Sequence, residues 1–328
     1  MKFLEIIVPQ YKENDLLVER LLKSIDKQVN IDFNDIEVTI INDGSNIFLS
    51  EEMLDKYKRL NISYIKNDKN LGAGPIRQKA VDMTDSKYIT FLDADDELAG
   101  ERSLEIIISC LKDTNKDILI TNVLVEKEYN GKNVLIEKKY GMSDAVLHGK
   151  YIKREYLDKN GVRFSNELKN FYEDSYYCMT LVGADALNIQ GIHLNFSSYI
   201  WRLNRESITK NTKKDYFVET IDDYIKCIIL TSDFLKEKNS ILSNPYIFDS
   251  VSFIYQLINS RMFKDIDISL YMKSIKDIFK KHKDIIKEVE KKKDIYDRAY
   301  DRLIDYRDLE TIGYKIPYNR FLKEIDQA

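Results

Sequence analysis

Short apolar runs alternate with amphipathic stretches along the first hundred residues. Phe3 to Val8 has the apolar character of a buried strand, and Asn14 then precedes leucines that are spaced as on one face of a helix. The pattern repeats, with further strands predicted over residues 36–41, 62–65 and 88–92, and further helices after residues 50 and 74. This alternation predicts an α/β fold in which a mostly parallel sheet is covered by helices on both faces.

The polar turns after three of these strands are expected to share one edge of the sheet. Pro9, Asn42 and Asp93 stand in turns of this kind, far apart in the sequence. Ligands of open α/β sheets bind where the carboxyl ends of the strands meet. The sequence therefore predicts one binding region that is built from distant segments.

The later part of the chain has a different pattern. Strands are predicted over residues 118–125 and 134–139, and from about Lys210 amphipathic helices follow one another. We therefore expect one domain over residues 1–211 and a helical region over residues 212–328. The apolar stripes of the helical region favour packing against the first domain. A homodimer contact or a substrate-recognition surface stays open as an alternative.

Charge is abundant but balanced. The 51 lysine and arginine residues nearly offset the 55 aspartate and glutamate residues, which gives a formal net charge of −4. No single-sign field favours nucleic-acid binding, and no cluster is evident that would attract anionic lipid. The apolar runs fall far short of the ~20 residues of a membrane-spanning helix, and Glu5 comes too early for a signal peptide. A cytoplasmic protein is expected, and peripheral association with the inner membrane face stays open.

Asp93, Asp95 and Asp96 place three carboxylates in the turn after one strand. Carboxylates this close repel one another unless a cation or hydrogen-bond donors compensate them. Mg²⁺ and Mn²⁺ prefer such oxygen ligands. A divalent-metal site is one interpretation of this turn, and an ordinary Asp-rich turn is the other.

Two helix starts also carry charge. Arg77 follows a glycine-containing loop, where it suits a phosphate group or a surface ion pair. Glu173 and Asp174 open a later helix, where a carboxylate could be a general base or simply an acid that the helix dipole favours. Position in the sequence does not distinguish the functional role from the structural one in either case.

Other candidates are weaker. His148 could line a cleft, and Trp201, near Arg205, could pack over a substrate or in the core. The cysteines are three in number and far apart, so they give no metal spacing and fit a reduced compartment.

Several segments have motifs in an order that is typical of one enzyme family. Residues 6–14 are similar to an opening strand with a Pro-x-Tyr-Asn turn, residues 41–45 to Asp-Asp-Gly-Ser, and residues 70–78 to Asn-x-Gly…Ala-Arg-Asn. Residues 88–96 carry a D-x-D motif, residues 148–174 look like an acceptor region, and residues 201–208 resemble a Tyr-Arg…Ser-Ile element. Over about 210 residues the chain thus resembles the glycosyltransferase family 2 enzymes, which have the GT-A fold.

The resemblance implies an inverting enzyme that moves a sugar from a UDP-sugar to a hydroxyl group with the help of Mn²⁺ or Mg²⁺. The acceptor would be a polysaccharide, a lipid-linked glycan or a protein. Residues up to about 100 would bind the nucleotide, and residues 101–211 would bind the acceptor. Asp174 would be the base that deprotonates the acceptor hydroxyl, and Asp95 would hold the cation.

The resemblance also implies further contacts. Pro9, Tyr11 and Glu13 would border the nucleotide base, and Asp43 would read the uracil edge. Arg77 would lie near the phosphates. Asp93 would approach the ribose. The remaining expected contacts are Asn70, Gly72 and Ala94 with the nucleotide sugar, and Asp96, His148, Glu173, Trp201 and Arg205 with the donor or the acceptor.

Some positions depart from the family pattern. Gln10, Lys12, Asn42 and Gln78 stand where other residues are usual, which leaves the fold prediction intact and blurs the identity of the donor. Two alternatives are kept. A nucleotidyltransferase would require a glycine-rich, lysine-containing loop near the first strand, which this chain lacks; a GT-A protein without turnover would serve as a binding or scaffold protein.

Overall fold

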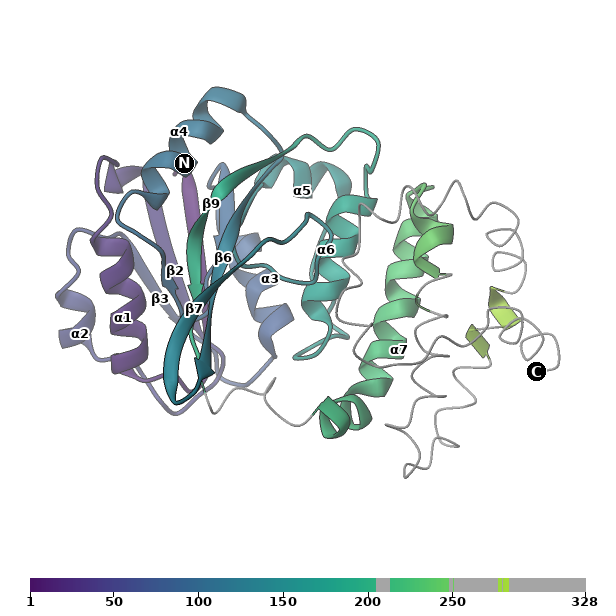
Figure 1. Cartoon of the computed structure of the whole chain (residues 1–328), viewed down its shortest axis with the longest axis horizontal. Helices are drawn as coiled ribbons and strands as arrows, with labels where there is room; N and C mark the ends of the chain where they lie inside the picture. Colours follow the sequence, from purple (N-terminus) through teal and green to yellow (C-terminus); the bar gives the residue numbers. More distant parts are fainter. Residues whose placement is uncertain (205–212, 248–249, 251–276, 279, 283–328) are drawn as a thin grey trace. The chain divides into compact units, whose positions relative to one another are not determined.

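The structure is a computed structural model that describes residues 1–204, 213–247, 250, 277–278 and 280–282 (Figure 1). The chain divides into two compact units, Met1–Cys178 with Leu187–Arg205, and Met179–Ala186 with Glu206–Ala328. The division falls within helix α6 (Glu173–Gly183). The domain limits predicted from the sequence, 1–211 and 212–328, stay a prediction.

The first half of the sheet is parallel. Its strands lie in the order β3 (Ile62–Lys66), β2 (Ile36–Asn42), β1 (Leu4–Gln10) and β4 (Tyr88–Phe91). β1 pairs with both β2 and β4 in parallel, and β2 with β3. The strand–helix alternation of the sequence predicts this arrangement because parallel neighbours need a crossover between them. The predicted α/β fold is confirmed.

The second half of the sheet is mixed. Its strands are β8 (Lys150–Lys153), β6 (Ile118–Tyr129), β9 (Gly191–Trp201), β5 (Glu97–Leu98) and β7 (Lys132–Lys138). β8 is antiparallel to β4 and β6, β9 is parallel to β6, and β5 is antiparallel to β9. The parallel order expected for most of the sheet therefore ends at β4.

Helices cover the sheet on both faces. α1 (Asp15–Asp26) begins at Asn14, whose side chain accepts the N–H of Leu17 at 3.3 Å as the sequence predicts. α1, α2 (Glu51–Asp55) and α4 (Ser103–Thr114) share a core cluster with Leu4, Ile6 and Val8 of β1. Ile7 points to the opposite face, because side chains alternate along a strand. α3 (Ala73–Met83) contacts β1 and β2 outside that cluster.

Short elements complete the first unit. A 3₁₀ turn (Phe33–Asp35) precedes β2, and α5 (Arg154–Asn160) follows β8 directly. On the face away from the core cluster, the rings of Phe91, Phe164 and Tyr177 pack together, with Phe164 stacked on Tyr177 at 4.0 Å between centroids. This aromatic packing joins β4 to α6 and so anchors the start of α6 beside the sheet.

The second unit contains α7 (Lys213–Glu237). Ile221, Ile225 and Ile228 are buried, as the predicted apolar stripe requires, whereas Ile229 is 37% exposed. Ile278, in a second apolar stripe that the sequence predicts over residues 275–289, is buried too. The rest of that stripe lies outside the described residues.

Candidate active site

Three polar turns follow neighbouring parallel strands. In β1, Gln10 lies opposite Asn42 of β2, and Ile7 lies opposite Phe91 of β4. The chain therefore leaves β1, β2 and β4 at one edge of the sheet. This register places the turns that begin after these strands within reach of one another.

Asp43 holds the loop that leads into α3. Its two carboxylate oxygens accept the backbone N–H groups of Leu71 at 2.7 Å and of Gly72 at 2.8 Å. Gly72 has a φ of +95°, and a Cβ there would lie 2.6 Å from the Cβ of Lys169. A residue with a side chain would thus be strained and crowded at this position. Asp43 is buried, and it fixes where α3 begins.

Arg77 projects from α3 and contacts three carboxylates. Its Nη2 donates to Asp93 Oδ1 at 2.9 Å, and its Nη1 donates to Asp174 Oδ1 at 2.9 Å and Glu173 Oε1 at 3.3 Å. Gly74 lets the start of α3 lie close to Glu173. A Cβ at this position would lie 2.8 Å from the carbonyl oxygen of Leu168 and 3.0 Å from the Cβ of Glu173. The guanidinium joins the turn after β4 to the first turn of α6.

One guanidinium does not neutralise three carboxylates, of which Glu173 is buried and Asp93 and Asp174 are half-buried. Burial opposes ionisation of Asp93, yet the charge and the hydrogen bond of Arg77 outweigh it and hold the pKa of Asp93 below its ordinary value. Burial, together with the charge of Asp174, raises the pKa of Glu173 to about 8. Burial also raises the pKa of Asp174, against the opposing effect of Arg77. The pKa of Glu173 therefore lies above neutral pH, which favours its protonated form.

The other two aspartates of the turn have their own hydrogen-bond donors. Asp95 Oδ2 accepts the side-chain amide of Asn204 at 2.7 Å. Asp96 accepts the hydroxyl of Tyr199 at 2.6 Å and the backbone N–H of Arg202 at 2.7 Å. Burial and the nearby charges of Asp93 and Asp95 raise the pKa of Asp96 well above its ordinary value. A cation would relieve this repulsion.

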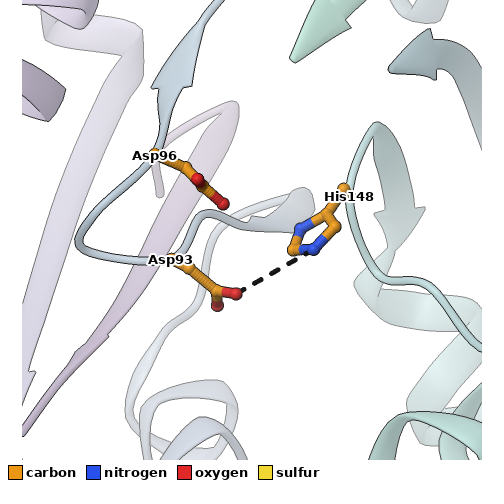
Figure 2. A group of neighbouring side chains, drawn as sticks. All are labelled: Asp93, Asp96 and His148. Atoms are coloured by element: carbon orange, nitrogen blue, oxygen red, sulfur yellow. Dashed lines mark ion pairs between the residues drawn. The ribbon is translucent and has the colours of Figure 1, made fainter. Parts of the chain in front are cut away.

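Asp93, Asp96 and His148 point toward one another from two segments of the chain (Figure 2). One ligand atom from each lies within 4.8 Å of the others, and His148 Nε2 is 3.9 Å from Asp93 Oδ2. The imidazole packs against the rings of Tyr199 and Trp201 at 4.4 and 5.1 Å between centroids. Burial lowers the pKa of His148, which favours the neutral form that binds metal ions. Two carboxylates and an imidazole suit a divalent ion such as Mn²⁺.

Asp95, the residue expected to hold the cation, is not in this group of three. Its backbone carbonyl accepts a hydrogen bond from Arg20. Burial raises the pKa of its carboxyl, and Asn204 opposes that effect. The turn thus offers two arrangements for a metal ion, one through Asp95 and one through Asp93 and Asp96, which variants can separate.

The remaining expected contacts are distributed around this cluster. Pro9 is half-buried in β1, and Tyr11 and Asn70 are exposed in the loops after β1 and β3. Glu13 turns back on its own loop, where it accepts the N–H groups of Tyr11 at 2.8 Å and of Lys12 at 3.2 Å. Ala94 is buried. Arg205 lies outside the described residues.

Two of the unusual residues in the motifs stabilise loops. Gln10 donates to the carbonyl oxygens of Glu13 at 2.7 Å and Ile47 at 3.1 Å. Asn42 accepts the N–H of Ser45 at 2.7 Å and donates to the same Ile47 carbonyl at 2.8 Å. Both side chains are buried. Their departure from the family pattern therefore has a structural explanation.

Three residues in or beside the site are not among those that the sequence predicts. Tyr199 and Asn204 reach the aspartate turn from a strand and a loop that begin a hundred residues later. Lys150 is fully buried beside Cys178, to whose sulfur its ammonium donates at 3.3 Å. A lysine at the start of a buried strand is a signal in the sequence that points to such a position. Tyr199 gave no such signal, because tyrosine is common in strands.

Comparison with known proteins agrees with this geometry. A family model described as glycosyl transferase family 2 matches residues 5–171, which is just over half of the chain. The chain belongs to glycosyl transferase family 2. The resemblance inferred from the motifs is confirmed, and the membership favours sugar transfer over nucleotidyl transfer.

Curated relatives match over parts of their length. An uncharacterized glycosyltransferase from Methanocaldococcus jannaschii is 35% identical over 115 residues, which cover 34% of this chain and 38% of the relative. A processive diacylglycerol beta-glycosyltransferase from Mycoplasma pneumoniae is 28% identical over 127 residues, which cover 38% of this chain and 36% of the relative. The chain thus spans little more than a third of the length of these relatives.

Solved structures extend the likeness of the fold. The crystal structure of S. aureus TarS 1-349 has a TM-score of 0.62 at 19% identity, and the match covers 85% of this chain and 80% of that chain. This identity is low, so the match bears on the fold, and it confirms the predicted GT-A architecture. Within the part of the chain that the structure describes, no helix is long and apolar enough to span a membrane.

Proposed function

We propose that this chain is an inverting glycosyltransferase that moves a sugar from a UDP-sugar to an acceptor hydroxyl, with a divalent cation at the aspartate turn. One observation carries the proposal: Arg77 ties Asp93 of the D-x-D turn to Asp174 at the start of α6, at 2.9 Å each. The D-x-D motif and the candidate base thereby lie on either side of the buried Arg77 guanidinium. In this proposal, residues 1–211 are the catalytic domain and residues 212–328 a helical accessory region.

The donor end of the site is the edge formed by β1, β2 and β4. Asp43 fixes the loop at the start of α3, and the exposed Tyr11 and Asn70 flank the place proposed for the nucleotide base. Family membership supports a nucleotide sugar as the donor. TarS, which shares the fold, has been solved in complex with UDP and with UDP-GlcNAc, which makes UDP the first nucleotide to test.

Asp93, Asp96 and His148, or Asp95 in their place, would hold the cation. A divalent cation there supplies charge that stabilises the departing diphosphate. The chain's own residues hold the proposed ligands in position and in a suitable protonation state. Tyr199 and the backbone of Arg202 hold the Asp96 carboxylate in place, and burial lowers the pKa of His148, which favours its neutral form.

Asp174 is proposed as the base. Its raised pKa makes the ionised carboxylate a stronger proton acceptor than an ordinary aspartate. Asp174 takes the proton of the acceptor hydroxyl, whose oxygen attacks the anomeric carbon on the face opposite the diphosphate. The new glycosidic bond forms as the bond to the diphosphate oxygen breaks, so the anomeric configuration inverts. Arg77 positions the base by donating a hydrogen bond to its Oδ1.

The acceptor is proposed only as a hydroxyl of a glycan, a lipid or a protein. Relatives point in different directions. One is a processive diacylglycerol beta-glycosyltransferase, and another, from Staphylococcus epidermidis, is a teichoic acid poly(glycerol phosphate) polymerase that is 37% identical over 126 residues, 38% of this chain and 16% of that protein. A conserved fold with varied acceptors agrees with donor binding in the N-terminal half and acceptor binding beyond it.

The test begins without an acceptor. UDP- and GDP-sugars are screened for metal-dependent hydrolysis, and UDP with Mn²⁺ is expected to raise the melting temperature. Asp95→Ala and Asp96→Ala are compared with Asp113→Ala, which changes an exposed residue of α4. Loss of the metal-dependent shift in the first variant alone assigns the ion to Asp95, and loss in the second alone assigns it to Asp96. If no nucleotide shifts the melting temperature with any divalent cation, the donor site is wrong.

A further inference from the structure

β6 and β7 form a hairpin that runs past the rest of the sheet. Residues Val123 to Tyr129 pair with residues Lys132 to Lys138 in an antiparallel register. The pairing of β6 with β9 ends at Val125, so beyond that point the two hairpin strands have only each other as neighbours among the described strands. Asn130 and Gly131 make the two-residue turn with φ values of +50° and +73°. This is the backbone conformation that a tight hairpin requires.

The two faces of the hairpin carry opposite charges. Residues that pair directly share a face, and successive residues alternate between faces. The face that we name the basic face carries Lys127, Tyr129, Lys132, Val134, Ile136 and Lys138. The acidic face carries Glu126, Glu128, Asn133, Leu135 and Glu137. The sequence from 126 to 138 mixes lysines and glutamates, and the strand period separates them.

The basic face is exposed. Tyr129, Val134 and Ile136 are 69%, 37% and 41% accessible, and all three lysines are exposed. None of these lysines forms an ion pair with any residue that the structure describes. The acidic face, in contrast, has partners: Glu126 accepts a hydrogen bond from Arg202 at 3.2 Å, and Glu137 from Ser197 at 2.7 Å. The lysines of the basic face are therefore available for a contact outside the described part of the chain.

We propose that the basic face docks on an anionic membrane surface. A membrane interface rewards both features of this face together, since apolar side chains enter the boundary between headgroups and acyl chains while lysines meet anionic headgroups. Lysine stems also lie along apolar surface with their ammonium groups extended. The hairpin would hold the chain at a lipid surface without spanning it. This proposal is independent of the sugar chemistry.

Two other occupants fit less well. A soluble polyanion would use the lysines and leave Tyr129, Val134 and Ile136 in water. A second copy of the chain, paired through the same face about a two-fold axis, would bring three lysines against three lysines. The combination of unpaired lysines with apolar side chains favours the membrane.

The test is binding of the full chain to vesicles. We expect sedimentation with vesicles that contain phosphatidylglycerol, far less with pure phosphatidylcholine, and weakening by salt. Replacing Lys127, Lys132 and Lys138 by Gln should lower the affinity by about fivefold per lysine, and so on the order of a hundredfold. Ile136→Asn should lower it by roughly threefold to tenfold.

Matched controls are present in the same molecule. Leu135→Asn changes an exposed residue of the acidic face, and Gln at Lys23, Lys27 and Lys58 removes three exposed lysines elsewhere. Both controls should bind vesicles like the unchanged chain. The UDP-dependent thermal shift of every variant reports separately on folding and on the donor site, so that failure of one proposal is not mistaken for failure of the other.

Several results would overturn the proposal. Absence of vesicle binding, or an equal loss in the control lysine variant, removes the special role of the hairpin. Competition by soluble polyphosphate combined with an unchanged Ile136→Asn variant assigns the face to a polyanion. A dimer in solution that Ile136→Asn converts to a monomer assigns it to a second copy of the chain.

Discussion

The aspartate turn and the β6–β7 hairpin are both rich in charge, and they handle it in opposite ways. In the site, carboxylates from two distant segments converge on Arg77. In the hairpin, neighbouring lysines and glutamates are sent to opposite faces of a two-stranded ribbon. The first arrangement concentrates charge of one sign, and the second separates two signs that the sequence mixes.

Burial explains the difference. Charges taken out of water are costly unless they are paired, hydrogen-bonded or neutralised by a proton. Arg77 is buried, and the raised pKa of Glu173 is the response of a carboxyl group that has too few partners. The hairpin lysines remain in water and need no partner, so their position can serve an external contact. A cluster of charges thus needs compensating partners within the protein only where water is excluded.

Asp174→Asn tests the chemistry of the carboxylate cluster around Arg77 and should have the largest effect. The amide cannot accept the proton of the acceptor, so transfer and donor hydrolysis should fall by roughly 10² to 10⁴-fold. UDP binding with Mn²⁺, followed by thermal shift, should survive. Asp113→Asn is the control. Retained transfer by Asp174→Asn would reassign the base.

Arg77→Met tests whether one cation holds the buried region together. Removing it leaves Asp93, Glu173 and Asp174 without their shared partner, and we expect a loss of about 3 kcal/mol in the free energy of unfolding. Urea unfolding measures this loss. Arg102→Met removes an exposed arginine that pairs with Glu105 on the surface, and it should leave the unfolding midpoint in place. Equal midpoints for both variants would show that the carboxylates do not depend on Arg77.

Glu173→Gln tests the proton in the buried region and should have the smallest effect. The pKa of Glu173 rises from 4.5 to about 8 on folding, so the folded state keeps a proton that the unfolded chain releases in this window. Stability must then fall as the pH rises between these values. Gln removes this slope, so the variant should gain on the order of 1 to 2 kcal/mol relative to the unchanged chain between about pH 5 and about pH 6.5.

Urea midpoints at several pH values measure this gain. Glu167→Gln, at an exposed position nearby in the sequence, should not change the pH dependence. If the slope of Glu173→Gln equals that of the unchanged chain, Glu173 is already ionised in the folded state. The cluster would then need a different source of compensation.

Local patterns predicted most of the first half of the fold. Asn14 caps α1, Pro75 falls in the first turn of α3, and β1, β2, β3 and β4 lie within about two residues of their predicted limits. These features depend on neighbours in the sequence, so the sequence displays them directly. The strand order of the mixed second half of the sheet does not follow from local patterns, because it depends on pairings between distant segments.

The sequence by itself determined the family, the α/β alternation and the residue types available at the strand ends, because each of these is written in a local motif or period. Tertiary structure decided which of those residues meet. It set Arg77 against both Asp93 and Asp174, brought His148 and Tyr199 to the aspartate turn, and left Asp95 beside Asn204. The sequence shows no cluster that would attract anionic lipid, because lysines and glutamates are mixed along the hairpin. Only the pairing of β6 with β7 shows that these charges lie on separate faces, because a face is a property of paired strands and not of composition.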